Sequence, residues 1–141
     1  MTPSAQTVYL TTLAATAELA AAAVELLPDG TLLVLSGPLG SGKTTFTKAL
    51  VAALDPDMRV SSPTYSLVHE YPTAAGLVVH MDAYRLGDAA LLEQLGLDEY
   101  LERARLVIVE WGGELAERQG AAWLEFGFDE DSRWARWRKL P

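Results

Sequence analysis

A glycine-rich run that ends in lysine and threonine is the part of this sequence best suited to chemistry. Residues 37–44 are Gly-Pro-Leu-Gly-Ser-Gly-Lys-Thr and fit the pattern G-x-x-x-x-G-K-[ST]. Its glycines allow backbone conformations closed to other residues, so that successive N–H groups can converge on phosphate oxygens. Lys43 adds a compact positive charge, and the Thr44 hydroxyl can reach a Mg²⁺ that bridges the phosphates. The run therefore predicts a site for a nucleoside phosphate and its metal.

The segments on either side of this run would hold it in place. Residues 32–35 are a continuous apolar run, typical of a strand buried on both faces. Residues 46–54 repeat apolar side chains along one face of a helix, which Asp55-Pro56 should end. A helix that starts where the loop ends directs its unpaired N–H groups and positive dipole end at the phosphates. The alternative, an incidental Gly/Ser turn, is disfavoured by this strand–loop–helix context.

Two acidic residues stand at the ends of later apolar runs. Asp82 follows the run at 77–79, and Glu110 closes the fully aliphatic run at 106–109. In a parallel sheet such strand ends share one edge, where ligands bind. Both carboxylates are therefore candidates to hold a magnesium ion or its water beside the loop. A helix or turn cap is the alternative for Asp82.

Two further segments have two interpretations each. Ser62-Pro63 stiffens the loop that carries Thr64, which is either a sensor of the terminal phosphate or part of an ordinary turn. The C-terminal cations, with Arg133 the first of them, are either a solvated basic tail or include a contact to nucleotide or partner. His80 is expected to be a packed, hydrogen-bonded histidine.

Length and charge restrict the classes of protein to which the chain can belong. Its 141 residues predict one domain over residues 1–141. A net charge of −8 disfavours direct binding of nucleic acid. Cysteine is absent, which fits a reducing cytoplasm, and no Lys or Arg precedes Lys43, so we expect no signal or transit peptide. No uncharged apolar run reaches membrane-spanning length.

The order of predicted elements indicates an α/β fold. Helices are expected at 13–27, 88–95 and 98–104. An aspartate should cap each of the last two helices, and Gly96 separates them. Strands are expected at 67–71, 122–128 and 133–138, with a turn at 72–76. Together with the elements above, they predict a P-loop NTPase fold. Its sheet should be mainly parallel and flanked by helices, with an antiparallel C-terminal edge.

Four ordered motifs together resemble the TsaE (YjeE) family. They lie at residues 39–46, 62–65, 80–86 and 109–111, and the resemblance covers residues 13 to 138. It implies a P-loop ATPase that takes ATP and Mg²⁺ and takes part in tRNA threonylcarbamoyladenosine biosynthesis. It also implies two partners, a TsaD-like transferase subunit and its TsaB-like paralogue, through which the chain would reach tRNA. ATP hydrolysis would drive turnover of that complex and would be slow without it.

The resemblance also assigns roles to single residues. It places Thr64 on a switch-like loop, Thr16 near the adenine, Arg133 at the nucleotide, and Trp111 in activity and assembly. It assigns hydrolysis to Lys43, Thr64, Asp82 and Glu110, phosphate binding to Gly40, Ser41, Gly42, Lys43, Thr44 and Thr45, and the metal to Thr44, Asp82 and Glu110.

The chain departs from the family pattern at several positions, but none of these departures removes a phosphate or metal ligand. Pro38 replaces an acid, Ser41 an alanine, Met81 and Ala83 bulkier residues, and Gly112 a proline. Two other functions compete with the ATPase. One is a small-molecule kinase, against which stands the lack of an arginine-rich lid. The other is a nucleotide-binding module without hydrolysis, which the retained lysine and carboxylates disfavour.

Overall fold

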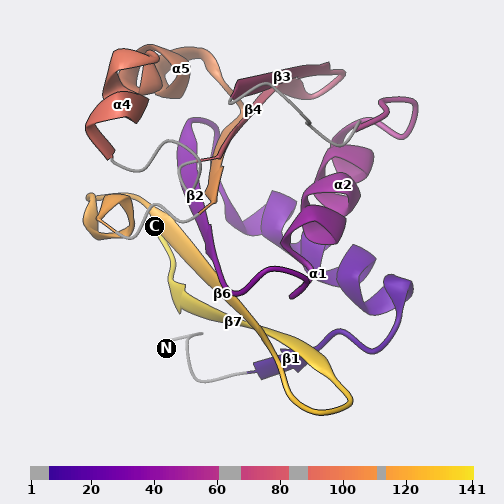
Figure 1. Ribbon diagram of the computed structural model, residues 1–141. Helices are drawn as coiled ribbons and strands as arrows, with labels where there is room; N and C mark the ends of the chain where they lie inside the picture. The colour runs from indigo at the N-terminus through magenta and orange to yellow at the C-terminus, as the bar shows by residue number, and fades with distance from the viewer. Residues whose placement is uncertain (1–6, 61–67, 83–88, 111–113) are drawn as a thin grey trace.

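Strand β2 (Thr31–Ser36) lies at the centre of a seven-stranded sheet with the order β1-β7-β6-β2-β5-β4-β3 (Figure 1). The computed structural model describes residues 7–60, 68–82, 89–110 and 114–141. Strands β6 (Ala122–Phe128) and β5 (Leu106–Glu110) flank β2 in parallel, and β4 (Gly76–Asp82) runs parallel to β5. The predicted parallel centre of the sheet is therefore confirmed.

The register brings the ends of the parallel strands together. Leu35 is the partner of Glu110, and Glu110 is in turn the partner of Asp82. The chain leaves β2 one residue after Leu35 and enters the glycine-rich loop. The loop and the two carboxylates therefore lie at one edge of the sheet, as predicted.

Both sides of the sheet end in antiparallel strands. The predicted C-terminal edge is confirmed, with β7 (Arg133–Lys139) paired to β6. Two features were not predicted: the antiparallel pairing of β3 (Val68–Thr73) with β4, and strand β1 (Thr7–Tyr9) on β7. The latter has three exposed residues, too few to produce a periodic pattern. Strand β3 also includes Pro72, expected in a turn, because an edge strand tolerates the missing N–H.

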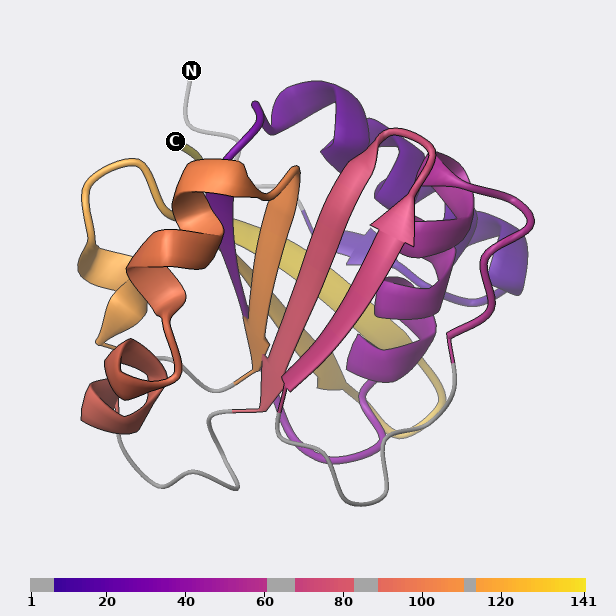
Figure 2. The ribbon, with the colours of Figure 1, turned by 90° about the horizontal axis from the view of Figure 1, so that it is seen from above.

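Helices cover the two faces of the sheet separately (Figure 2). Helix α1 (Leu13–Leu26) and helix α2 (Lys43–Leu54) pack on one face. Helix α4 (Ala89–Gln94), helix α5 (Leu97–Arg103) and the 3₁₀ helix η2 (Leu115–Glu117) pack on the other. Alternate residues of β2 and β5 enter the two cores, which explains their continuous apolar runs. None of the helices in the described part of the chain is long and apolar enough to span a membrane.

One predicted helix cap is wrong. Asp98 does not cap α5; Gly96 does, in a left-handed conformation, and the Tyr100 N–H donates to its carbonyl at 3.0 Å. Asp98 instead lies in the first turn, where a carboxylate still interacts favourably with the positive end of the helix dipole. The other predicted cap, Asp88, lies outside the described residues.

Candidate nucleoside-phosphate site

The glycine-rich loop passes tightly against strand β6. Gly37 has a φ of 140°, and a Cβ built there would lie 2.4 Å from the Phe126 carbonyl oxygen. Only glycine allows so close an approach of two backbones. At the other end Gly42, with a φ of 108°, is the N-cap of α2 and has no side chain to occupy the helix end. The backbone of the loop is therefore fixed at both ends, by the end of β2 and by the start of α2.

The start of α2 offers hydrogen-bond donors to a ligand. Its first hydrogen bond runs from the Phe46 N–H to the Gly42 carbonyl at 2.9 Å, so the N–H groups of Thr44 and Thr45 have no partner within the helix. The Ser41 hydroxyl is buried and finds no hydrogen-bond partner in the described part of the chain. Unused donors beside the positive end of a helix dipole fit a phosphate group.

Lys43 lies between the loop and the carboxylates. Its ammonium donates to the Gly37 carbonyl at 2.6 Å, and the residue is buried. Burial lowers the pKa of Lys43, while the charges of Glu110 and Asp82 oppose that shift. The positive charge is thus held in a partly desolvated position next to the loop, where its interaction with a phosphate is stronger than in water.

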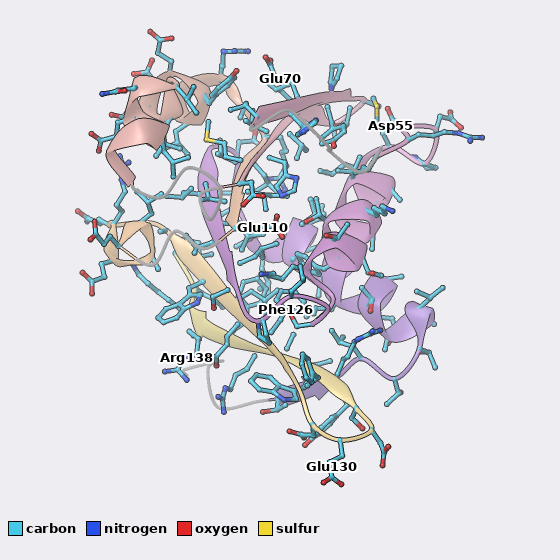
Figure 3. The ribbon with its side chains drawn as sticks, in the orientation of Figure 1. Asp55, Glu70, Glu110, Phe126, Glu130 and Arg138 are labelled. Carbon is cyan, nitrogen blue, oxygen red and sulfur yellow. The ribbon has the colours of Figure 1, made fainter. Side chains whose placement is uncertain are left out.

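Glu110 is held by a histidine on the neighbouring strand. In Figure 3 it lies at the end of β5, and its side chain is only 13% exposed. His80 Nε2 donates to Glu110 Oε2 across 3.1 Å. Burial alone would raise the pKa of Glu110, but this hydrogen bond and the charges of His80 and Lys43 hold the pKa below its usual value. The carboxylate is therefore ionised and oriented at neutral pH.

Three oxygen-bearing residues at this edge fit a magnesium ion. Thr44 is exposed in the first turn of α2, and Asp82 and Glu110 are register partners on β4 and β5. Mg²⁺ prefers oxygen ligands and is commonly held by one or two carboxylates together with substrate phosphates. The donor set matches that preference, so Thr44, Asp82 and Glu110 are the residues that would hold the metal.

A pocket of about 210 Å³ adjoins the loop beside α1. Thr16, Gly42, Thr45 and Arg133 share its lining. The resemblance alone placed Thr16 near the nucleotide and selected Arg133 from the C-terminal cations. The Arg133 guanidinium Nε donates to the Gly40 carbonyl at 3.0 Å, which ties β7 to the loop. The pocket has room and hydroxyl groups for the nucleoside end of a nucleotide. Sequence reasoning missed the other lining residues Leu10, Thr11, Thr12 and Leu13, which carry no motif.

A larger pocket of about 650 Å³ lies against the turn between β6 and β7, and it shares Leu10, Thr11 and Arg133 with the smaller pocket. Residues 128–133 form one wall, and Leu39 and Gly40 contribute from the loop. Leu39 is 95% exposed and Phe128 is 53% exposed. Sequence reasoning did not find this pocket, because the residues that form it are distant in the chain.

The described structure thus places the sequence-predicted residues in one region. The loop residues, Thr16, Asp82, Glu110 and Arg133 meet at the carboxyl edge of the sheet or in the adjoining pocket. Thr64 and Trp111 lie outside the described residues.

Replacing Gly37 by alanine should destabilise the fold by about 3 kcal/mol or more, because the methyl group meets the β6 backbone and the φ is strained. Gly40→Ala is the matched control: it has a φ of 81°, but nothing lies within 4 Å of its Cβ. That variant should lose only about 1 kcal/mol from the left-handed conformation. Urea unfolding of both variants measures the difference, and equal losses would refute the steric explanation.

Comparison with known proteins identifies relatives of the whole site-bearing region. The family model described as "Threonylcarbamoyl adenosine biosynthesis protein TsaE" matches residues 10–137. A Bacillus subtilis protein named tRNA threonylcarbamoyladenosine biosynthesis protein TsaE is 42% identical over 89 residues, and a Haemophilus influenzae protein of the same name is 39% identical over 80 residues. These matches cover 63% and 57% of this chain but only 55% and 51% of the relatives, about half of their length.

Longer matches agree with these two. A Mycobacterium bovis protein of the same name is 40% identical over 126 residues, covering 80% of this chain and 74% of the relative. The crystal structure of Bacillus subtilis YdiB superposes with a TM-score of 0.72 at 27% identity, over 94% of this chain and 83% of that one. The fold, the ordered motifs and a family match over residues 10–137 agree: the chain belongs to the TsaE family.

Proposed function

We propose that this chain is the ATP-hydrolysing component of the machinery that makes threonylcarbamoyladenosine in tRNA. It binds ATP with Mg²⁺ and drives turnover of a partner complex made of a TsaD-like transferase subunit and a TsaB-like paralogue. The observation that carries the proposal is the position of Lys43. Its ammonium donates to the Gly37 carbonyl and interacts electrostatically with the carboxylates of Glu110 and Asp82. A module that only bound phosphate would not need two carboxylates at that point.

The residues of the site have separate tasks in this proposal. The loop and the N-terminus of α2 bind the phosphates, and Lys43 neutralises charge that develops on the transferred group. A bound Mg²⁺ would add charge neutralisation and geometry at the phosphates. Asp82 and Glu110 would hold the metal or position the attacking water, and the hydrogen bond from His80 fixes the orientation of Glu110. Thr64 is assigned the sensing of the terminal phosphate.

The surface around the site supports a requirement for partners. Leu13, Leu39 and Phe128 are exposed apolar residues that line the two pockets beside the loop. Exposed apolar patches of this kind mark interaction sites. A chain of net charge −8 repels RNA. The partner complex would therefore bring this chain to tRNA, in the cytoplasm. A partner that covers this surface would complete the site, so the isolated protein should hydrolyse ATP slowly.

Phosphate release from ATP and Mg²⁺ tests the proposal. We expect slow turnover by the protein alone and an increase of about tenfold or more when both partner proteins are added. A rate that the partners leave unchanged, but that a small hydroxyl-bearing metabolite raises, would instead show a kinase.

A further inference from the structure

In the described part of the chain, no helix buries a residue of strand β7 on the face opposite α1 and α2; at the end of the strand, Lys139 Nζ donates to the Ala116 carbonyl of η2 at 2.9 Å. Ala135 and Trp137 point into the core beneath α1 and α2. Trp134, Arg136 and Arg138 alternate with them and therefore lie on the opposite face. The core on that face, formed with α4, α5 and η2, takes no buried residue from β7. In Figure 3 the Arg138 side chain points away from the body of the protein, on the side opposite α1 and α2.

This surface, which we call the Arg–Trp face, consists of Trp123, Glu125, Trp134, Arg136 and Arg138. The Arg136 guanidinium lies 5.2 Å from the centre of the Trp134 ring, and that of Arg138 lies 5.5 Å from the centre of the Trp123 ring. Both arginines share one oxygen of Glu125, at 3.1 and 3.6 Å. Two cations against one carboxylate leave the face with a net positive charge.

The two indole rings are fixed in place. A Cβ added to Gly127 would lie 2.2 Å from Trp134 Cζ2, so the Trp134 ring rests directly on the backbone of β6. The Trp123 ring N–H donates to the Ser36 hydroxyl at 2.7 Å. Rigid aromatic groups that are already in position cost little entropy when a partner binds.

We propose that the Arg–Trp face binds an acidic segment of a partner protein. Trp and Arg are the residues that most often dominate protein–protein interfaces. Strand β7 holds four of the 11 Lys and Arg residues and no acid, in a chain with net charge −8, so its charge is complementary to carboxylates. The half-exposed Arg138, the more weakly bound of the two to Glu125, is the group that an incoming carboxylate would engage first.

The same observations disfavour RNA as the occupant. The net charge of the chain repels a long polyanion such as an RNA strand, which would extend beyond the local positive charge of the face. Each indole ring already has a guanidinium over it, so neither offers a free surface for stacking of a base. A short acidic peptide segment needs only the local positive charge. This inference goes beyond the ATPase proposal, because no residue of the face has a role in nucleotide or metal binding in that proposal.

The test uses the full chain and a short synthetic peptide of alternating glutamate and alanine. NMR titration should shift the indole N–H signals of Trp123 and Trp134 saturably, with weaker binding as salt rises. A uridine oligonucleotide of equal charge is the comparison. Tighter binding of that oligonucleotide, or no saturable indole shift with the peptide, would overturn the proposal.

Variants show whether the arginines are responsible. The double substitution Arg136→Gln and Arg138→Gln should weaken peptide binding about tenfold or more. Glu125→Gln should strengthen it, because the internal competitor for both arginines is removed. Arg103→Gln is the matched control, since Arg103 also lies over an aromatic ring (Tyr100, 4.8 Å) and pairs with a glutamate (Glu70, 3.8 Å).

Arg103→Gln should leave peptide binding unchanged, and all variants should bind ATP as the unmodified protein does. Equal losses in the Arg103 variant and the double variant would overturn the assignment of the face. ATP binding is read independently, so failure here is distinguishable from failure of the ATPase proposal.

Discussion

Substituting Lys43 by methionine is expected to lower the rate of ATP hydrolysis about a thousandfold and to weaken ATP binding. Methionine keeps much of the length of the side chain but removes the charge and the hydrogen bond to the Gly37 carbonyl. Without the ammonium, the charges of Glu110 and Asp82 oppose the approach of phosphate instead of being balanced. Phosphate release and calorimetric titration with ATP measure the two effects.

Lys48→Met is the control, because Lys48 is exposed on the same helix α2. It should retain both ATP binding and hydrolysis. Thermal unfolding of the two variants checks that neither loses the fold. If Lys43→Met hydrolyses ATP at the original rate, the assignment of the site is wrong.

The part of the site that sequence could predict depends on local spacing. Residues 37–44 form one continuous loop, and their conformations follow from glycines and the start of a helix. Asp82 and Glu110 could be placed at strand ends because apolar runs precede them, and parallel strands end at one edge. These inferences need no knowledge of how distant segments pack.

The part that could not be predicted depends on contacts between distant segments. Arg133 reaches the Gly40 carbonyl across 93 residues of chain, and its position follows from the pairing of β7 with β6. His80 meets Glu110 only because the register aligns β4 with β5. Strand β1 depends on pairing with β7 and carries no pattern of its own. No local rule gives these registers.

Substituting Glu110 by glutamine is expected to reduce ATP hydrolysis by about a hundredfold or more while ATP remains bound. Glutamine has the same size and can still accept a hydrogen bond from His80, so the change removes mainly the charge that would hold the metal or orient water. Glu70→Gln is the control, since Glu70 also accepts a hydrogen bond, from Tyr100 at 3.1 Å, but lies on β3 away from the loop. Phosphate release and ATP binding are measured for both.

Partner turnover separates an ATPase from a pure binding module. If the Glu110→Gln protein binds ATP, fails to hydrolyse it and still supports turnover of the partner complex, hydrolysis is not required and the proposed function is wrong. Loss of hydrolysis together with loss of partner turnover supports it. Equal loss in the Glu70 control would point to a general effect of removing surface charge.

The pH dependence of stability tests the environment of Glu110 without any ligand. Burial opposes ionisation, but the hydrogen bond from His80 and the charges of His80 and Lys43 prevail, so the pKa of Glu110 is lowered in the folded protein. A lowered carboxyl pKa stabilises the fold at pH values above the unfolded pKa of about 4.3, and that contribution is lost as the pH falls through the folded pKa. Glutamine does not titrate. The measured quantity is the difference in unfolding free energy between the unmodified protein and the Glu110→Gln protein. This difference should decrease on acidification below about pH 4.3. A difference that stays constant would show that Glu110 ionises as it does in the unfolded chain.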